Sequence, residues 1–281
     1  MNNITFVIFT YNEEKRIELV IRNVKKYGDV IVFDGGSTDN TQQLTESLGA
    51  LFVARPTQDK VYVETQKMYD CLLEHVKTDW IFWDFADNIL PKTALEKLRE
   101  ISNQVKIKYV NVPLFTYLWG KIDTPANKSY SPRFFHKDYL NFEDNPIHGM
   151  GVFTGNKDEQ MILTSKPEFA LEHYSLYDVE KFTHSHLRYG VAEAEGRFEA
   201  GEKFSTFRMI GSMVRSFFLY YKAGYKNGRV GFFVALLYAS FRLQTHVKLY
   251  ELEHGITIDS IEEKYRRKKQ QFVDSIEHID V

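Results

Sequence analysis

Short apolar runs alternate with amphipathic segments through the first hundred residues, and this alternation restricts the fold more than any other feature of the sequence. Four of the runs have the length and composition of buried strands: Ile4–Phe9, Val30–Phe33, Leu51–Val53 and Trp80–Trp83. The segments between them carry apolar residues at helical spacing, as in Ile17, Val20, Ile21 and Val24. Repeated strand–helix units predict a parallel sheet with helices on both faces, and hence an α/β fold.

A polar cluster follows three of these runs at the point where each predicted strand ends. The clusters are Thr10–Glu13, Asp34–Asp39 and Asp84–Asn88. Ligands of open α/β sheets bind at the carboxyl ends of the strands, so the three clusters are expected to converge there. The sequence therefore predicts a site for a polar small molecule at this edge.

The second half of the chain follows a different pattern. From about Lys106 to Lys166, short strand-like stretches such as Tyr109–Val112 and Arg133–Phe135 are mixed with loops, and after about Glu168 the chain is mainly helical. We therefore expect two parts: residues 1–168 with the mixed sheet and the polar site, and residues 169–281 as a helical extension.

Composition excludes several classes of protein. The net charge of −2 and the absence of a recognisable nucleic-acid module argue against nucleic acid as a partner. The single cysteine, Cys71, excludes an internal disulfide framework and a multi-cysteine zinc site. The first strand lacks a Gly-X-Gly-X-X-Gly fingerprint, and the chain has no Gly-X-X-X-X-Gly-Lys loop, which argues against dinucleotide enzymes and P-loop NTPases.

Two of the polar clusters allow a structural or a functional interpretation. The segment Asp34–Asp39 is either a strand-to-helix turn with a cap, or a loop in which Asp34 accepts a hydrogen bond from a nucleobase. Asp84 and Asp87 are either a surface acid and a helix cap, or oxygen ligands suited to Mg²⁺ or Mn²⁺.

Three segments of the first half form a recognisable set. They read FVIFTYNEE at Phe6–Glu14, VIVFDGGSTDNT at Val30–Thr41 and DWIFWDFAD at Asp79–Asp87. Together they resemble glycosyltransferase family 2, of the type that decorates bacterial lipopolysaccharide cores and related surface glycans. Gly228–Phe232 followed by Lys248–Glu251 is a further match. The resemblance implies a GT-A-like, Rossmann-type mixed sheet flanked by helices. It also implies an inverting glycosyltransferase that transfers a sugar from a nucleotide-sugar, expected to be a UDP-sugar, to an acceptor hydroxyl.

The resemblance also implies roles for residues that match the family's motifs. Thr10, Tyr11 and Glu13 would line the nucleoside pocket, and Asp34 would meet the base. Gln66 and Lys67 fall where the family has residues near the donor.

Further matches concern the diphosphate and a divalent metal. Asp87 matches the second acid of the family's Asp-X-Asp metal motif, whereas Phe85 stands where the first acid belongs and Asp84 comes one position earlier. Arg133 matches an arginine that could face the phosphates, and His173 matches a position that could hold metal. Each has a plain structural alternative, a surface ion pair for Arg133 and a packed histidine for His173.

The catalytic base stays open at this point. Relatives often carry His-Glu where this chain has His148 and Gly149, and that acid is a candidate base. Glu143, Asp144 and His148 are the remaining candidates near this position.

The helical part has an unusual charge distribution. Between Ser205 and Tyr250 there is no Asp or Glu, while seven Lys and Arg residues are interleaved with aromatic residues. Basic, aromatic, amphipathic segments suit the interface of an anionic membrane, although a core helix pair with a basic solvent face is the alternative. We expect no secretory signal and no apolar run long enough to span a bilayer, and hence a peripheral location on the cytoplasmic face of the membrane.

The acceptor expected at such a location is a lipid-linked or lipopolysaccharide-type glycan. Two other kinds of protein fit parts of the pattern: a nucleotide-sugar-binding protein without transfer activity, and a membrane-interface scaffold of a glycan assembly complex. A capping-box pattern at Ser260–Glu263 opens the last helix, whose apolar stripe either packs on the domain or pairs with a second subunit in a homo-oligomer.

Overall fold

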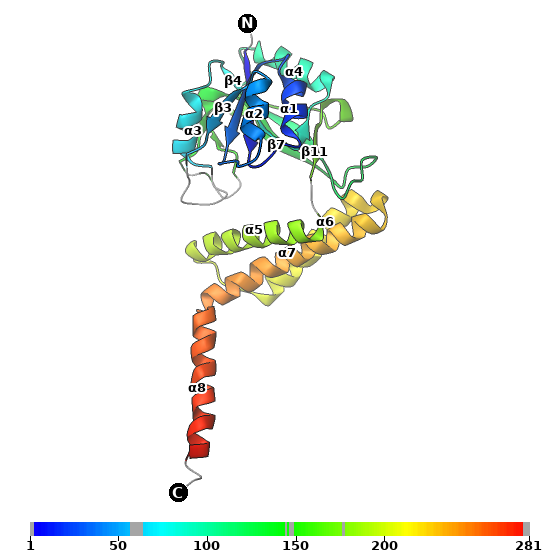
Figure 1. Ribbon diagram of the computed structural model, residues 1–281. Coiled ribbons are helices and arrows are strands. Elements are labelled where there is room, and N and C mark those ends of the chain that lie inside the picture. The colour runs from blue at the N-terminus through cyan, green and yellow to red at the C-terminus, as the bar shows by residue number, and fades with distance from the viewer. Residues whose placement is uncertain (1–2, 57–63, 144, 146–148, 176–177, 278–281) are drawn as a thin grey trace. The chain divides into compact units, whose positions relative to one another are not determined.

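The computed structural model describes residues 3–56, 64–143, 145, 149–175 and 178–277. The chain divides into two compact units (Figure 1). Unit 1 comprises Met1–Asp178 and Ala223–Gly231, and unit 2 comprises Val179–Lys222 and Phe232–Val281.

Unit 1 is built on a nine-stranded mixed sheet in the order β3-β2-β1-β4-β7-β6-β11-β5, with β10 beside β6. Its strands are β1 Ile4–Thr10, β2 Asp29–Asp34, β3 Leu51–Ala54, β4 Trp80–Phe85, β5 Asn88–Ile89, β6 Tyr109–Tyr117, β7 Asn127–His136, β10 Gln160–Ile162 and β11 Leu171–Tyr174. A separate two-stranded sheet pairs β8 Leu140–Asn141 with β9 Val152–Phe153. Strands β3, β2, β1 and β4 are parallel, as the strand–helix repeats predict, and β7 runs antiparallel to β4.

Helices cover both faces of this sheet because side chains alternate along each strand. In β1, Ile4, Phe6 and Ile8 join one core cluster, and Val7 and Phe9 join the other. Helices α1 Ile17–Val24 and α4 Lys92–Ser102 contribute to the first cluster, with α2 Thr41–Ser47 packed against it. Helix α3 Gln66–Leu73 contributes to the second cluster.

Strand register determines which polar side chains share an edge of the sheet. Thr10 is paired with Asp34 across β1 and β2, and Phe9 with Phe85 across β1 and β4. The carboxyl ends of these strands therefore lie side by side, as the sequence predicts. His173 on β11 is paired with Asn88 on β5, which adds a residue from far along the chain.

Unit 2 consists mainly of four helices: α5 Val179–Glu199, α6 Thr206–Gly224, α7 Arg229–Glu253 and α8 Ile258–Glu277. The end of α6, the 3₁₀ turn Tyr225–Asn227 and the start of α7 belong to unit 1. There the Asn227 side chain donates to the Thr124 carbonyl at 3.2 Å, which fixes the turn to the loop between β6 and β7. Further 3₁₀ turns lie at Lys137–Tyr139, Lys157–Glu159 and Pro167–Phe169.

Helix α7 is the one helix of the described residues that is long and apolar enough to cross a membrane by length and composition. This differs from the expectation that no run approaches that length. A third of its most apolar window is buried, and Arg242 at its centre forms a two-pronged ion pair with Glu193 of α5. These two bonds join α7 to α5 within unit 2.

Three predicted boundaries differ from the structure. Unit 1 extends beyond residue 168 because β11 pairs with β6 and β5. Strand β7 begins at Asn127, well before the strand-like stretch Arg133–Phe135 that the sequence predicts. Helix α8 begins at Ile258, because Thr257 and Ser260 cap each other with reciprocal side-chain-to-backbone hydrogen bonds.

Candidate functional site

Asp34 lies at the end of β2 and organises the loop that follows. One carboxylate oxygen accepts from the hydroxyls of Thr10 at 2.8 Å and Ser37 at 2.5 Å, and the other accepts from the backbone N–H groups of Gly36 and Ser37. Burial opposes ionisation, but these bonds together hold the pKa of Asp34 below its ordinary value. All four acceptor positions are thus occupied, so a nucleobase could bond to Asp34 only if the Ser37 hydroxyl rotates away.

The loop after β1 interlocks with the loop after β2. Asn12 has a positive φ of 56°, and its backbone N–H donates to the Ser37 hydroxyl, while its side-chain oxygen accepts from the Thr38 N–H. This geometry leaves the Tyr11 ring 61% exposed beside the interlocked loops, free to stack on a planar ligand. Glu13, by contrast, forms an ion pair with Arg16.

Arg55, which the sequence did not single out, lies at the same edge. It directly follows β3, and its backbone N–H donates to the Asp34 carbonyl at 2.7 Å. A Cβ atom on Gly35 would lie 2.4 Å from the Arg55 guanidinium, so Gly35 leaves room for this side chain. Its position at the end of a strand adjoining β2 was the only available signal.

Asp84, Asn88 and His173 form a chain of hydrogen bonds below the edge. The Asn88 Nδ2 donates to Asp84 Oδ1 at 2.8 Å, and the Asn88 Oδ1 lies 2.8 Å from Nδ1 of His173. Asp84 also accepts from the Phe85 N–H, and it is only 1% exposed. Asp84 therefore supports Asn88 and does not face a ligand. Burial raises its pKa to about 6, although the hydrogen bonds and Arg133 favour the charged form.

This chain of bonds fixes which nitrogen of His173 carries a proton. Asp84 Oδ1 accepts, so the group that Asn88 turns toward it must be the NH₂. The Asn88 oxygen then faces His173, and Nδ1 of that histidine must be the donor. The neutral imidazole consequently presents the lone pair of Nε2, the nitrogen that can ligate a metal.

One carboxylate oxygen of Asp87 is buried without a hydrogen bond from the described residues. Its Oδ1 has no hydrogen-bond donor within the described part of the chain, and Nδ1 of His173 is 3.4 Å away, with its one proton directed to Asn88. Burial opposes ionisation of Asp87, but His173 and then Arg16 hold its pKa below the ordinary value. An ionised carboxylate oxygen without a donor fits a divalent cation.

The described residues supply this cation with only part of a coordination shell. Among them, no group of three His, Cys, Asp or Glu side chains lies close enough to hold a metal. The Asp87 carboxylate would therefore provide the one ligand that the described contacts support, and Mg²⁺-type ions usually complete such shells with water and substrate phosphates. The interrupted Asp-X-Asp motif is consistent with this, because Phe85 leaves one acid.

Arg133 supplies fixed positive charge beside these carboxylates. Its guanidinium donates to the Trp83 carbonyl at 3.2 Å and to the Ser131 hydroxyl at 2.9 Å, and it lies 4.8 Å from the centre of the Phe85 ring. Burial lowers its pKa from the ordinary arginine value, and Asp84 and Asp87 oppose that shift. The surface ion pair that was its structural alternative does not occur among the described residues.

Of the two donor-side candidates on α3, only Gln66 is hydrogen-bonded to another loop within the described part of the chain. The Gln66 side chain accepts from the Phe142 N–H at 2.9 Å and donates to Asp70, while Lys67 is exposed. Gln66 thus joins α3 to the loop that carries Glu143. Glu143 is exposed.

The candidate bases are only partly placed. Asp144 and His148 lie outside the described residues, so the choice among Glu143, Asp144 and His148 stays a prediction. Asn145 anchors their loop: it donates to the carbonyls of Glu64 and Gly149 and accepts from the Gly151 N–H.

The structure thus joins Thr10, Asp34, Asp87, Arg133 and His173 to one edge of the sheet. Sequence reasoning missed Arg16, Arg55 and Asn88. Asn88 belongs to the predicted polar cluster Asp84–Asn88, but its bond to His173 could not be predicted because the two residues are 85 positions apart.

Comparison with known proteins agrees with this arrangement. Residues 5–155 match the family described as Glycosyl transferase family 2. An uncharacterised glycosyltransferase of Rickettsia bellii is 29% identical over 262 residues, covering 89% of this chain and 86% of that protein. One of Rickettsia typhi is 28% identical over 273 residues, covering 90% and 88%.

Two solved structures show lower similarity to this chain. The mannosyltransferase PcManGT of Pyrobaculum calidifontis, in complex with GDP-Man and Mn²⁺, has a TM-score of 0.46 and 12% identity, covering 96% of this chain and 80% of that one. Glucosyl-3-phosphoglycerate synthase of Mycobacterium tuberculosis, in complex with phosphoglyceric acid, has a TM-score of 0.44 and 17% identity, covering 68% and 79%.

The match spans more than half of the chain and contains the ends of β1, β2 and β4, where the polar side chains meet. With its sheet of mixed strands and its helical C-terminal region, the chain belongs to glycosyltransferase family 2 and is a nucleotide-sugar-dependent glycosyltransferase.

Proposed function

We propose that the enzyme transfers a sugar from a UDP-sugar, with inversion, to a hydroxyl of a lipid-linked or lipopolysaccharide-type glycan at the inner face of the cell membrane. The observation that carries the donor half of this proposal is the unpartnered, buried Oδ1 of Asp87 beside His173. A carboxylate oxygen in that state favours a cation, and a cation at a strand end favours a diphosphate.

Fixed charges support the same location for the diphosphate. Arg133 is held by two hydrogen bonds and needs no reorganisation when negative charge develops nearby. Arg16 acts on the same carboxylate, since its charge helps to keep Asp87 ionised. A bound Mg²⁺ or Mn²⁺ would neutralise charge on the departing UDP.

The nucleoside half would lie along the interlocked loops. Tyr11 offers an exposed ring for stacking on the base, and Asp34 offers an acceptor for a base N–H once Ser37 turns away. Uracil fits this arrangement because its ring N–H is a donor, and GDP and other nucleotides are the competing outcomes.

Inversion requires one displacement in which a base removes the acceptor's proton as the oxygen attacks the anomeric carbon. The loop anchored by Asn145 carries the candidates Glu143, Asp144 and His148. A membrane-bound acceptor is supported by the acid-free, basic and aromatic stretch from Ser205 to Tyr250.

The test is a transfer assay with a panel of UDP-sugars, Mn²⁺ and detergent-solubilised lipopolysaccharide. Free UDP measures turnover, and the proton coupling of the new anomeric centre measures its configuration. We expect UDP release that depends on the acceptor, an inverted product, and loss of activity in Asp87→Asn. The matched control is Asp158→Asn, an exposed acid of the same unit. Turnover with GDP-sugars alone would refute the UDP assignment, and a retained configuration would refute inversion.

A further inference from the structure

Helix α6 carries an exposed apolar stripe, called here the α6 face. It consists of Phe207, Ile210, Val214, Phe218 and Tyr221, whose exposed fractions are 90%, 50%, 50%, 62% and 39%. Spacings of three and four residues place them within about 80° of the helix circumference. A continuous exposed apolar stripe of this kind marks an interaction surface.

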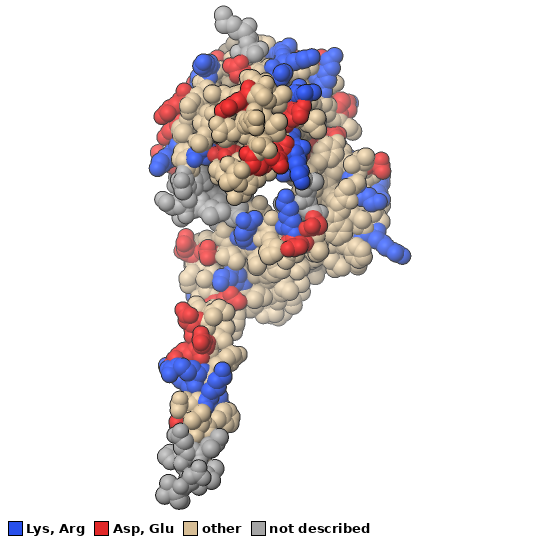
Figure 2. Space-filling model, in the orientation of Figure 1, with Lys and Arg blue, Asp and Glu red and all other residues tan. Residues whose placement is uncertain are grey.

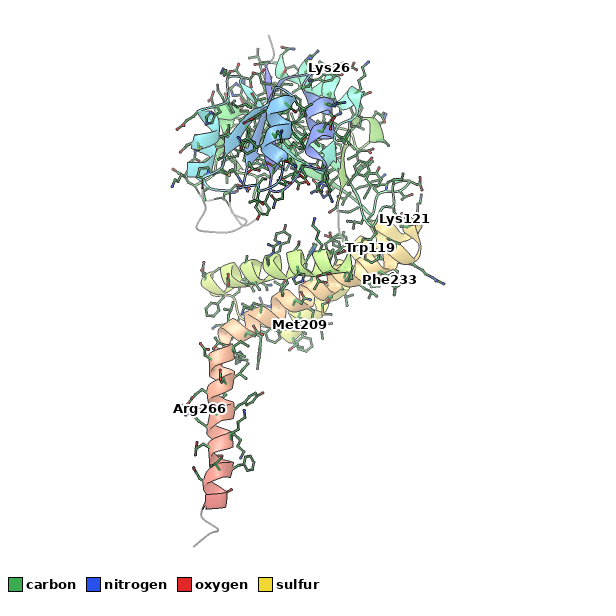
Figure 3. The ribbon with its side chains drawn as sticks, viewed as in Figure 1. Lys26, Trp119, Lys121, Met209, Phe233 and Arg266 are labelled. Atoms are coloured by element: carbon green, nitrogen blue, oxygen red, sulfur yellow. The ribbon has the colours of Figure 1, made fainter. Side chains whose placement is uncertain are left out.

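The α6 face points away from the neighbouring helix of its own unit. On the other side of α6, the Tyr220 ring stacks on Tyr238 of α7 with centroids 3.5 Å apart, and the Ser212 hydroxyl accepts from Arg242 at 3.1 Å. Met209, labelled on α6 in Figure 3, belongs to this inner side by helical spacing. Tyr221, at the end of the α6 face, lies edge-on to Phe232 of α7 with ring centroids 6.3 Å apart, while the other four members of the face are at least half exposed.

A basic row runs along one edge of the α6 face. Arg208, Arg215 and Lys222 are seven residues apart, and each directly follows a member of the face. All three are exposed, and Arg208 alone has an acidic neighbour among the described residues, Glu202 at 3.8 Å. Long basic side chains beside an apolar stripe can lie along it and place their charges at its rim.

Charge selects the occupant of this surface. A second copy would bring the same basic row, and the stretch from Ser205 to Tyr250 has no Asp or Glu to meet it. Figure 2 shows mostly uncharged surface on the visible part of α6 and α7, unlike the mixed charges along α8. A partner with an anionic surface and an apolar interior complements both the basic row and the apolar α6 face.

We propose that the α6 face lies in the interface of a bilayer that contains anionic phospholipid. The five apolar side chains enter the acyl region, and Arg208, Arg215 and Lys222 contact the lipid phosphates. The helix lies in the plane of the membrane, because a transverse orientation would place Arg215, near the middle of α6, at the bilayer centre. This assignment rests on the proposed membrane location and not on the sugar that is transferred.

The experiment is co-flotation of the full chain with vesicles of phosphatidylcholine, with or without about a third phosphatidylglycerol. One variant is Phe207→Ser with Phe218→Ser, and its control is Leu187→Ser on α5, another exposed apolar residue. The second variant replaces the basic row, as Arg208→Gln, Arg215→Gln and Lys222→Gln. Its control removes the same charge from unit 1, as Lys26→Gln, Lys106→Gln and Lys157→Gln.

We expect the wild type to bind only the anionic vesicles, and high salt to weaken that binding. The double phenylalanine variant should lose about 100-fold in partitioning, at roughly tenfold for each ring. The basic-row variant should also lose about 100-fold, at roughly fivefold for each charge. The controls should stay within about twofold of the wild type.

Three results would overturn the assignment: no vesicle binding by the wild type, equal binding by wild type and both variants, or a basic-row variant no weaker than its charge control. A wild-type dimer in sedimentation, dissociated by the phenylalanine variant without lipid, would instead give the α6 face to a second copy. Nucleotide titration of the same preparations distinguishes failure of the membrane assignment from failure of the transfer proposal, because α6 contributes no residue to the donor site.

Discussion

Replacement of Asn88 by alanine tests the hydrogen-bond chain beneath the donor site. The Asn88 side chain is fully buried and uses both ends of its amide, donating to Asp84 and accepting from His173. The alanine variant should therefore lower both stability and metal affinity.

The size of the stability change follows from the two lost bonds. The bond to the Asp84 carboxyl is worth about 2 kcal/mol when its acceptor is ionised, and the bond to His173 about 1 kcal/mol. Asp84 Oδ1 keeps its bond from the Phe85 N–H, and Nδ1 of His173 keeps only Asp87 Oδ1, 3.4 Å away, within reach among the described residues. We therefore expect the free energy of unfolding to fall by about 3 kcal/mol.

The proton position is read by ¹⁵N NMR of the histidine side chains, with His173→Gln to assign the signal. In the wild type, Nδ1 of His173 should carry the proton and Nε2 the lone pair. In Asn88→Ala the Oδ1 of Asp87, 3.4 Å from Nδ1, remains as an acceptor, so the proton should stay on Nδ1 while the ring turns toward Asp87. Because the ring is then no longer held by Asn88, Mn²⁺ affinity in the presence of UDP should fall about 10- to 100-fold. Asn88→Asp keeps an acceptor for His173, so its proton should stay on Nδ1.

Asn23→Ala is the matched control, because Asn23 also uses both ends of its amide, with the backbone of Leu90. It should lower stability without lowering Mn²⁺ affinity. A wild-type His173 with its proton on Nε2 would refute the deduction. A folded Asn88→Ala variant as stable as the wild type would refute the hydrogen-bond chain.

Three further predictions concern stability. The pKa of Asp84 is raised from 3.8 to about 6, so the folded state binds this proton more tightly than the unfolded chain does. The protonated carboxyl therefore stabilises the fold at low pH, and this stabilisation is lost as pH rises through about 6. Relative to wild type, Asp84→Asn should gain up to about 3 kcal/mol between pH 4 and 7 in chemical denaturation without metal, and a constant difference would contradict this. Gly231→Ala should lower the free energy of unfolding by about 2 kcal/mol, because its Cβ would lie 2.0 Å from a carbonyl oxygen. Gly211→Ala is the control, since a Cβ there would enter open space. Equal melting temperatures for the two variants would refute the clash. Arg242→Lys should cost about 1.5 kcal/mol by losing its two-pronged bond to Glu193, and a melting temperature equal to wild type would show that the pair contributes nothing.

The sequence predicted the parallel half of the sheet because local pattern determines it. Each apolar run of β1, β2 and β4 is long enough to bury, and each ends in polar residues that cannot be buried alone. Parallel pairing then brings Thr10 and Asp34 together whatever the rest of the chain does.

The second half of the sheet depends on pairings between distant segments, which periodicity does not encode. Strand β11 is only four residues long, yet it lies between β6 and β5 and carries His173 to Asn88. The resemblance to the family pointed to His173, but nothing in the sequence indicated that Asn88 would hold it.

Side-chain orientation was only partly predictable. Asp84 is a donor-site candidate by position, but alternation points it to the face opposite Phe85 if β4 continues, and the structure buries it there, where it supports Asn88. Arg55 and Arg16 could not be distinguished from ordinary surface cations, because their significance comes from neighbours on other strands and loops.

Calorimetric titration with UDP, GDP, CDP and ADP, each with and without Mn²⁺, tests the donor site most directly. The account predicts that UDP binds most tightly, that Mn²⁺ strengthens its binding, and that Asp87→Ala abolishes the metal effect while Asp158→Ala leaves it intact. Failure of the folded wild type to bind any of the four nucleotides, or a metal effect that survives in Asp87→Ala, would contradict it.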